Sequence, residues 1–347
     1  MTATDSTKRV TAPKIKLGRK VIACLCLLAV LALAVVASLI FGARPVPLAT
    51  LVESFSNFDD SAPDHVVVHS RIARTVGGIV VGAALGLSGA AMQGLTRNPL
   101  ADSGILGLNA GAALAVVSGI AFFGMTSLTG TMIAAFLGSA VVMALVYVVA
   151  SVGREGATPI KLALSGAALS VGFTAVTSAV LMVSTLALDE FRFWQIGTLA
   201  ARGVDTYLMV IPVVAVGALI VLGTARVSNA VAMGEDSATA LGFRLGRARV
   251  FGSVGIVLLV GTATAVAGPI AFVGLMIPHA VRLLVGSDYR WLMPASIIAG
   301  PILLLVADTL GRLINPPGEI QVGVMCAILG APLFIIMMRS GMKSVTL

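Results

Sequence analysis

The chain has 347 residues, of which 58% are apolar and only 11% are charged. Its mean hydropathy of +1.04 excludes an ordinary soluble globular domain. Continuous apolar runs of about 20 residues match the thickness of a bilayer, where unpaired backbone groups find no partner and helices are required. The net charge of +8 does not indicate a nucleic-acid partner, because the charges fall in short loops. We therefore predict an all-α, polytopic membrane protein.

Residues 1–20 are polar and basic and are expected to form a cytoplasmic tail. The apolar run that follows is longer than a secretory signal core and precedes no clear cleavage site, which favours a retained first helix. Residues 42–70 form an outer segment without a recognisable motif. Residues 21–347 are predicted to form a single transmembrane domain of ten helices. The expected spans are 21–41, 73–95, 105–123, 129–151, 161–187, 206–225, 250–268, 270–286, 291–311 and 321–339.

The distribution of Lys and Arg supports this arrangement, because most of the 23 basic residues fall in the tail and in loops on the same side. An excess of basic residues marks the cytoplasmic side, so both termini are predicted to be cytoplasmic. The expected location is the cytoplasmic membrane of a bacterium, with the lipid bilayer as a partner.

A weak internal repeat relates residues 81–99 to residues 260–278, which align without gaps and share Val, Gly, Ala, Gly and a final Pro. The predicted topology runs the two copies in opposite directions, as in the inverted repeats of transporters. Glycines are concentrated in the second span, where small residues let helix backbones approach closely. These glycines, which predict a tightly packed bundle, are Gly77, Gly78, Gly82, Gly86 and Gly89.

The polar stretch 226–249 is the one long cytoplasmic loop between spans. Its segment 234–242 is predicted to form one or two short helices, with Asp236 capping the second and Gly242 ending it. Because nearly all of the chain is apolar, an ordered polar loop of this kind suggests a surface for a partner. The arginines that frame it are Arg226, Arg244, Arg247 and Arg249.

No spacing of residues typical of catalysis, of ATP binding or of a metal site is found, so neither an enzyme nor a cofactor is predicted. His65 and His69 make at most half of a metal site, and a solvated or packing role is favoured. His279 is predicted to bond a neighbouring carbonyl inside a span. The three cysteines Cys24, Cys26 and Cys326 lie in apolar runs and are predicted to be small buried side chains.

Asp308 is the one acid of 15 that the predicted topology places within a span. Arg312 follows four residues later, and a structural ion pair is favoured over a proton relay. Carriers driven by an ion gradient usually keep ionisable groups within their spans. The sequence therefore favours energy supplied by another subunit, with an ion-driven carrier and a membrane-embedded enzyme as alternatives.

Several motifs closely resemble the permeases of ABC importers for ferric siderophores, haem and cobalamin. They lie at 71–112, 234–242, 267–296 and 307–336. One departure is Ala73, which stands where the usual Arg-Leu-Pro-Arg pattern has proline. The resemblance implies a ten-helix subunit that dimerises around a central translocation path with a second permease subunit, identical or related. It further implies two cytoplasmic ATP-binding subunits, an external binding protein, and an iron chelate as substrate, most often a ferric siderophore, with haem or cobalamin as alternatives.

The resemblance also implies roles for individual residues. Exposed guanidinium groups would dock the acidic side chains of a binding protein, although snorkelling to lipid headgroups is an alternative; these residues are Arg71, Arg74 and Arg312. A short helix would couple to the ATP-binding subunit, the alternative being a solvated loop; its residues are Gly234, Glu235, Asp236, Ala238, Leu241 and Gly242. An inner gate is implied at Asn98, Pro99 and Leu100. Polar residues that could line the path are Ser88, Gln93 and Asn109.

Overall fold

The computed structural model describes residues 16–44, 46–56, 61–153, 157–200 and 202–339. In these ranges the chain forms fourteen α-helices and no strand. The helices are α1 (Leu17–Ile40), α2 (Leu48–Ser56), α3 (Pro63–Thr96), α4 (Leu108–Phe123), α5 (Leu128–Ala150), α6 (Pro159–Val183), α7 (Thr185–Trp194), α8 (Val204–Gly223), α9 (Ala225–Ala232), α10 (Glu235–Ala240), α11 (Leu245–Ala267), α12 (Val273–Val285), α13 (Tyr289–Ile314) and α14 (Val322–Arg339).

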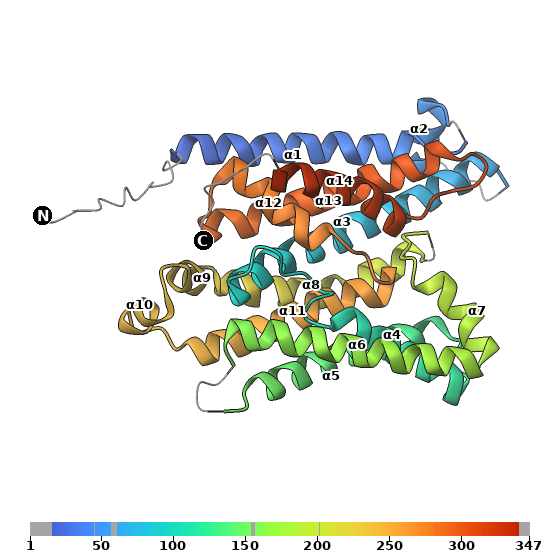
Figure 1. Ribbon diagram of the computed structural model, residues 1–347. Helices are drawn as coiled ribbons and strands as arrows, with labels where there is room; N and C mark the ends of the chain where they lie inside the picture. The colour runs from blue at the N-terminus through green and yellow to red at the C-terminus, as the bar shows by residue number, and fades with distance from the viewer. Residues whose placement is uncertain (1–15, 45, 57–60, 154–156, 201, 340–347) are drawn as a thin grey trace, which may run out of the picture.

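The described part of the chain holds seven helical segments long and apolar enough to cross a membrane, and three shorter apolar helices. Together they correspond to the ten predicted spans, and they confirm a multi-pass, all-α membrane protein. Most of these helices run along one common direction (Figure 1). We call the end that holds α9, α10 and the start of α1 the α10 end, and the end that holds α2 and α7 the α7 end.

Two predicted boundaries differ from the structure for local reasons. The fifth predicted span continued to residue 187, but α6 ends at Val183 and α7 begins at Thr185. Ser184 lies between them in an extended conformation, and its hydroxyl accepts a hydrogen bond from the Ala187 N–H at 3.2 Å, which starts a new helix. The second span was predicted from residue 73, whereas α3 begins at Pro63, a residue suited to a first helical turn.

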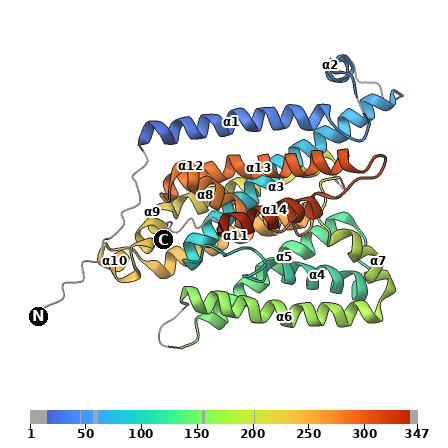
Figure 2. The ribbon, with the colours of Figure 1, turned by 45° about the horizontal axis from the view of Figure 1, so that its top comes forward.

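Helices α3 and α11 form the centre of the bundle, since 78% of the most apolar 18-residue stretch of each helix is buried. Helix α1 lies at the edge, because only 11% of the corresponding stretch is buried, and Figure 2 shows this helix along one side of the bundle. Close packing joins α3 to α13: a Cβ added at Gly82 would lie 2.6 Å from the Cα of Pro301. This contact confirms the tight glycine packing predicted for the second span.

The two copies of the sequence repeat do not superpose position by position. Both begin in a long helix that is followed by a non-helical stretch and a shorter helix. The first copy stays helical to Thr96, whereas in the second the helix ends at Ala267, which the gapless alignment pairs with Ser88. Helix order is therefore shared by the two copies, but the register of the alignment is not.

The terminal residues 1–15 and 340–347 lie outside the described residues, so the structure covers little of the predicted basic tail. The described remainder of the tail is residues 16–20, most of which belong to the first turn of α1. Helix α2 and the start of α3 fill the outer segment 42–70, for which the sequence offered no motif.

Candidate functional site

The predicted coupling segment 234–242 contains one short helix, α10, which follows another short helix, α9, at the α10 end of the bundle (Figure 1). Gly234 precedes α10 with φ of 117°, and Gly242 follows it with φ of 84°, a region in which a Cβ would be strained. The predicted end at Gly242 is thus confirmed. The predicted cap at Asp236 is wrong, because Gly234 is the N-cap and Asp236 lies in the first turn beside Glu235. Carboxylates in the first turn of a helix interact favourably with the helix dipole.

Only part of the coupling segment faces outward. Ala238 is fully buried, in contact with a small apolar cluster that includes Ala230 and Val231 of α9. The side of α10 that carries Ala238 therefore holds the helix to the bundle and is not available to a partner. Leu241 is 62% exposed, and Met233, which the sequence did not single out, is 65% exposed. Both are large apolar side chains exposed at the α10 end.

The predicted inner gate follows the end of α3 directly. Arg97 takes a left-handed conformation with φ of 49° and ends the helix. The Leu100 N–H then donates to the side-chain oxygen of Asn98 at 2.9 Å, which fixes a tight turn around Pro99. Leu100 is 39% exposed, so an apolar side chain is presented where a gate is predicted. The gating role itself remains a prediction.

Two of the three polar residues suggested for the path are buried within this chain. Ser88 and Gln93 are fully buried. The Gln93 amide donates to the Leu275 carbonyl at 3.3 Å and accepts from Arg282 at 3.1 Å, so it joins α3 to α12. Asn109 donates to the Ser103 hydroxyl at 3.3 Å within one segment of the chain. Ser88 and Gln93 therefore face the interior of this chain, whereas Asn109 is partly exposed.

Asp102 is a residue that sequence reasoning placed in a loop. In the structure the segment after α3 folds back against α12, and the carboxylate accepts from the backbone of Ser103 and of Phe272. A Cβ added at Gly274 in the first turn of α12 would lie 2.7 Å from an oxygen of Asp102. Asp102 is therefore a cap supplied to α12 by another segment. Sequence spacing alone carries no signal for this contact.

Arg71 and Arg312 lie at the α7 end but are not the exposed groups that were predicted, since they are 3% and 2% exposed. Arg71 donates to the carbonyls of Leu39 and Ile40 at 3.0 and 2.8 Å, and also to that of Arg44. Arg312 donates to the carbonyls of Ser38 and Phe41 at 3.1 and 3.0 Å. The orphan carbonyls at the end of α1 are thus satisfied by guanidinium groups of α3 and α13.

Arg74 contacts carboxylates of its own chain. It pairs with Glu319, in the segment between α13 and α14, and lies 3.9 Å from Asp308. The favoured ion pair of Asp308 with Arg312 is confirmed, with the Arg312 Nε at 3.0 Å from the carboxylate. Of the three predicted docking residues, Arg74 is the one whose partner, Glu319, is 38% exposed. Sequence reasoning did not assign a role to Glu319, although it lies in one of the resembling motifs.

The histidine and cysteine predictions have mixed outcomes. His279 Nδ1 lies 3.0 Å from the Leu275 carbonyl, which confirms the predicted bond to a neighbouring carbonyl. Cys326 is buried as expected, but Cys24 is only partly buried and Cys26 is exposed, because α1 lies at the edge of the bundle. Within the described residues no group of three His, Cys, Asp or Glu side chains could hold a metal ion.

The profile of the FecCD transport family matches residues 30–340. The chain is 44% identical over 314 residues to the ferric enterobactin transport system permease protein FepD of Escherichia coli (strain K12), with 90% of this chain and 93% of FepD covered. It is 40% identical over 328 residues to the probable siderophore transport system permease protein YfiZ of Bacillus subtilis (strain 168), with 94% and 98% covered.

A solved structure of a proposed metal-chelate type ABC transporter in an inward-facing conformation is similar to this chain, with a TM-score of 0.80 and 28% identity. The similarity covers 91% of this chain and 98% of the solved one. The two folds are therefore similar over most of both chains. The family match, these sequence relatives and this fold agree, and the chain belongs to the FecCD transport family.

Proposed function

We propose that the chain is the transmembrane permease subunit of an ATP-driven importer that moves a ferric siderophore inward after delivery by an external binding protein. The observation that carries the proposal is the coupling segment. In a chain of this family, a short helix at one end of a membrane bundle keeps Leu241 62% exposed, although burial of such a side chain would be favourable. An exposed anchor of this kind fits a cleft on a cytoplasmic partner.

The proposed mechanism uses no chemistry on this chain. Two ATP-binding subunits hydrolyse ATP, and each receives one α10 helix from a pair of permease subunits, identical or related. When the ATP-binding subunits close, α10 moves as a rigid element and shifts the helices joined to it. The turn at Asn98, Pro99 and Leu100 then opens or closes the inner mouth of the path between the two permeases. The α10 end is cytoplasmic in this arrangement.

At the α7 end, the binding protein docks through acidic side chains. Arg74 is the group best placed to receive them, since its present partner Glu319 is partly exposed. Charge pairs of this kind steer association and fix orientation, and salt weakens them. Arg71 and Arg312 already donate hydrogen bonds to the carbonyl groups at the end of α1. We therefore assign these two residues a structural role beside Arg74.

A ferric siderophore is the favoured substrate, because the relatives FepD and YfiZ are named for ferric enterobactin and siderophore transport. Other relatives are named for hemin and for cobalamin, and these substrates are the alternatives within the same class. We assign the selection among these substrates to the external binding protein.

The test is uptake into liposomes that contain this chain, its ATP-binding subunit and its binding protein. Ferric enterobactin, a ferric hydroxamate, hemin and cobalamin are supplied in turn, with ATP or with a proton gradient alone. We expect uptake of a ferric siderophore that requires ATP. Leu241→Asp places a charge in the proposed contact with the ATP-binding subunit and is expected to abolish uptake. Ser287→Asp adds the same charge to another exposed site at the α10 end and is expected to leave uptake unchanged.

Each outcome bears on a different part of the proposal. Uptake driven by the proton gradient without ATP would contradict it and would favour an ion-driven carrier with Asp308 as the coupling acid. ATP-dependent uptake of hemin or cobalamin alone would keep the importer and exclude the siderophore. Equal loss in Leu241→Asp and Ser287→Asp would remove the coupling role of α10.

A further inference from the structure

Helix α10 depends on its neighbours for its position. It has six residues, which is too short for an isolated helix to be stable in water. Its buried residue Ala238 packs with Ala230 and Val231 of α9, and Phe243 and Leu245 cover the same cluster. Helices α9 and α10 therefore form one unit, which we call the coupling unit (residues 225–245).

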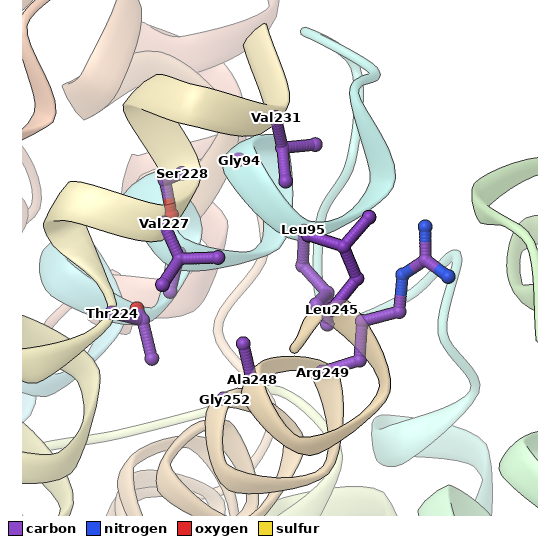
Figure 3. A pocket seen from close by; sticks show the side chains of 11 residues that line it. Gly94, Leu95, Thr224, Val227, Ser228, Val231, Leu245, Ala248, Arg249 and Gly252 are labelled. Carbon is purple, nitrogen blue, oxygen red and sulfur yellow. The ribbon is translucent and has the colours of Figure 1, made fainter. Parts of the chain in front are cut away.

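A small cavity lies beside the coupling unit. Its volume is about 30 Å³, and it is lined by residues of the coupling unit, α3 and α11 (Figure 3). Gly94 and Leu95 of α3, Val227 and Val231 of α9, and Ala248 of α11 line this space. Protein interiors contain few unfilled spaces, and groups beside a gap resist displacement less than close-packed ones. The contact with α3 is close beside this space, since a Cβ added at Gly94 would lie 3.1 Å from the Ser228 hydroxyl oxygen.

Arg249 of α11, which also lines this cavity, makes a direct polar connection to α10. Its Nη2 lies 2.6 Å from the Glu235 carboxylate at the start of α10. Its Nη1 donates to the Ala157 carbonyl at 2.9 Å. The side chain is 13% exposed, and Figure 3 shows its guanidinium pointing away from the cavity. A planar guanidinium can hold two partners in fixed directions, which a lysine cannot do.

Ala157 belongs to the junction of two membrane helices. It precedes Thr158, the N-cap of α6. It is buried in a cluster with Val146 and Ala150 of α5 and Leu162 of α6. Arg249 therefore links the coupling unit to the α5–α6 junction across α11, although residues 157 and 249 are far apart in the sequence.

A second connection leads elsewhere. Asn229 of α9 donates to the Asp288 carboxylate at 2.7 Å and accepts from the Tyr289 N–H at 2.9 Å. It joins the coupling unit to the start of α13, on the other half of the bundle. The two polar connections thus reach different membrane helices, and Arg249 is the one that reaches α6.

We propose that Arg249 is a positioning residue that carries the displacement of α10 to α5 and α6 when the cytoplasmic partner moves. The inference rests on the proposed function. It adds that energy coupling to this half of the bundle passes through the Glu235–Arg249–Ala157 contact. Without it, the ATP-binding subunit still binds α10 and hydrolyses ATP, but α6 no longer follows.

The test compares Arg249→Gln with Arg247→Gln in the reconstituted importer. Both remove one positive charge from α11, but Arg247 is exposed. The measured quantity is substrate taken up per ATP hydrolysed. We expect Arg249→Gln to lower this ratio on the order of tenfold while keeping ATP hydrolysis, a size typical of a coupling contact. Arg249→Lys keeps the charge but loses the planar group that can contact two partners at once. Its uptake per ATP hydrolysed is expected to lie between that of Arg249→Gln and that of the unaltered chain.

A second readout follows the movement itself by hydrogen exchange of backbone amides. In the unaltered complex, addition of ATP is expected to change exchange both in α10 and at Leu162 in the first turn of α6. In Arg249→Gln the change is expected in α10 alone. Glu235→Gln combined with Arg249→Gln is expected to add little to either single change, because both break one contact.

The outcomes separate this inference from the proposed function. Equal ratios in Arg249→Gln and Arg247→Gln, with intact uptake, would overturn the inference and leave the importer standing. Absence of ATP-dependent uptake in the unaltered complex would overturn the proposed function and the inference with it. If Arg249→Gln does not assemble, Arg249→Lys decides, and an unchanged ratio there overturns the inference.

Discussion

At the scale of single residues, Arg71 and Arg312 show how context decides what a cation does. Both lie where a docking surface was predicted, but their donors are directed at the last carbonyls of α1. Helix ends leave such carbonyls without partners, and a buried carbonyl without a donor is costly. The resemblance placed both arginines at one end of the bundle. The sequence could not show that carbonyls about 30 and 270 positions away in the chain would be their partners.

A first prediction tests this supporting role. Arg71→Gln removes charge-assisted hydrogen bonds to the carbonyls of Leu39 and Ile40 and is expected to lower the free energy of unfolding by about 2 kcal/mol. Arg192→Gln is the control, because Arg192 is exposed and makes only a surface pair with Asp189 at 3.5 Å. It is expected to change stability by less than about 0.5 kcal/mol. Thermal unfolding in detergent measures both. Equal stability of the two variants would show that the α1 contacts contribute nothing.

A second prediction concerns Arg74 and its partner within the chain. A carboxylate of the binding protein must displace Glu319 from Arg74, so Glu319→Gln is expected to strengthen docking several-fold at low salt. Arg74→Gln is expected to weaken it. Both differences should shrink as salt is raised, because surface charges are then screened.

The control for this pair is Glu190→Gln, which removes an exposed carboxylate of α7 at the same end of the molecule. Docking affinity is measured by titrating the binding protein onto the solubilised chain. If Glu190→Gln strengthens docking as much as Glu319→Gln does, the effect is one of net charge. Arg74 would then not be a specific docking group.

At the scale of elements, glycine determines how closely the central helices approach. A Cβ at Gly82 would lie 2.6 Å from atoms of the α13 backbone, so the two helices are in direct backbone contact. Such contacts replace the hydrophobic driving force that helices lack in lipid. The sequence predicted this packing because glycines recur at helical spacing in one apolar run, a local and periodic signal.

Gly82→Ala is the third prediction. The added methyl group meets backbone that cannot move aside, and overpacking is expected to cost about 1–3 kcal/mol of unfolding free energy. Gly172→Ala in α6 is the matched control, since nothing lies within 4 Å of a Cβ there. It should be neutral or stabilising by up to about 1 kcal/mol, because alanine favours a helix. The unfolding midpoints of both variants give the answer, and similar midpoints would exclude the close packing of α3 on α13.

Elements were predictable where one signal dominated and were missed where several short segments met. The long apolar runs gave ten spans with ends close to those observed. Helix α7 was hidden because the apolar character of 161–187 runs through Ser184, where a single hydroxyl cap divides two helices. The contact of Asp102 with the first turn of α12 depends on a fold-back of the segment after α3, and no local pattern in the sequence encodes it.

At the scale of the whole molecule, the bundle has two chemically different ends. One presents Leu241 and Met233 on short polar helices, and the other presents ion pairs around Arg74. The sequence indicated this division through the placement of basic residues and through the resembling motifs. It could not separate the buried members of each site, Ala238 and Arg71, from the exposed ones, because burial depends on helices distant in the chain.

The orientation of the bundle gives the fourth prediction. Asn315→Cys at the α7 end is expected to react with a membrane-impermeant maleimide added to intact cells. Ser287→Cys at the α10 end should react only after the membrane is opened. Both positions are exposed in the structure. The unaltered chain is the control, because its cysteines lie within helices expected to be in the membrane. Labelling of Ser287→Cys in intact cells would contradict the proposed orientation and place the α10 end outside the cell.

The attachment of α1 has a consequence for the synthesis of the protein. Arg71 of α3, which donates to the Ile40 carbonyl, is made soon after α1. Arg312, which donates to the Ser38 carbonyl, follows 274 residues later. Lys20 near the other end of α1 lies 3.9 Å from Asp288, also a late residue. The contacts that hold α1 are therefore completed in two stages of synthesis, an early one with α3 and a late one with α13.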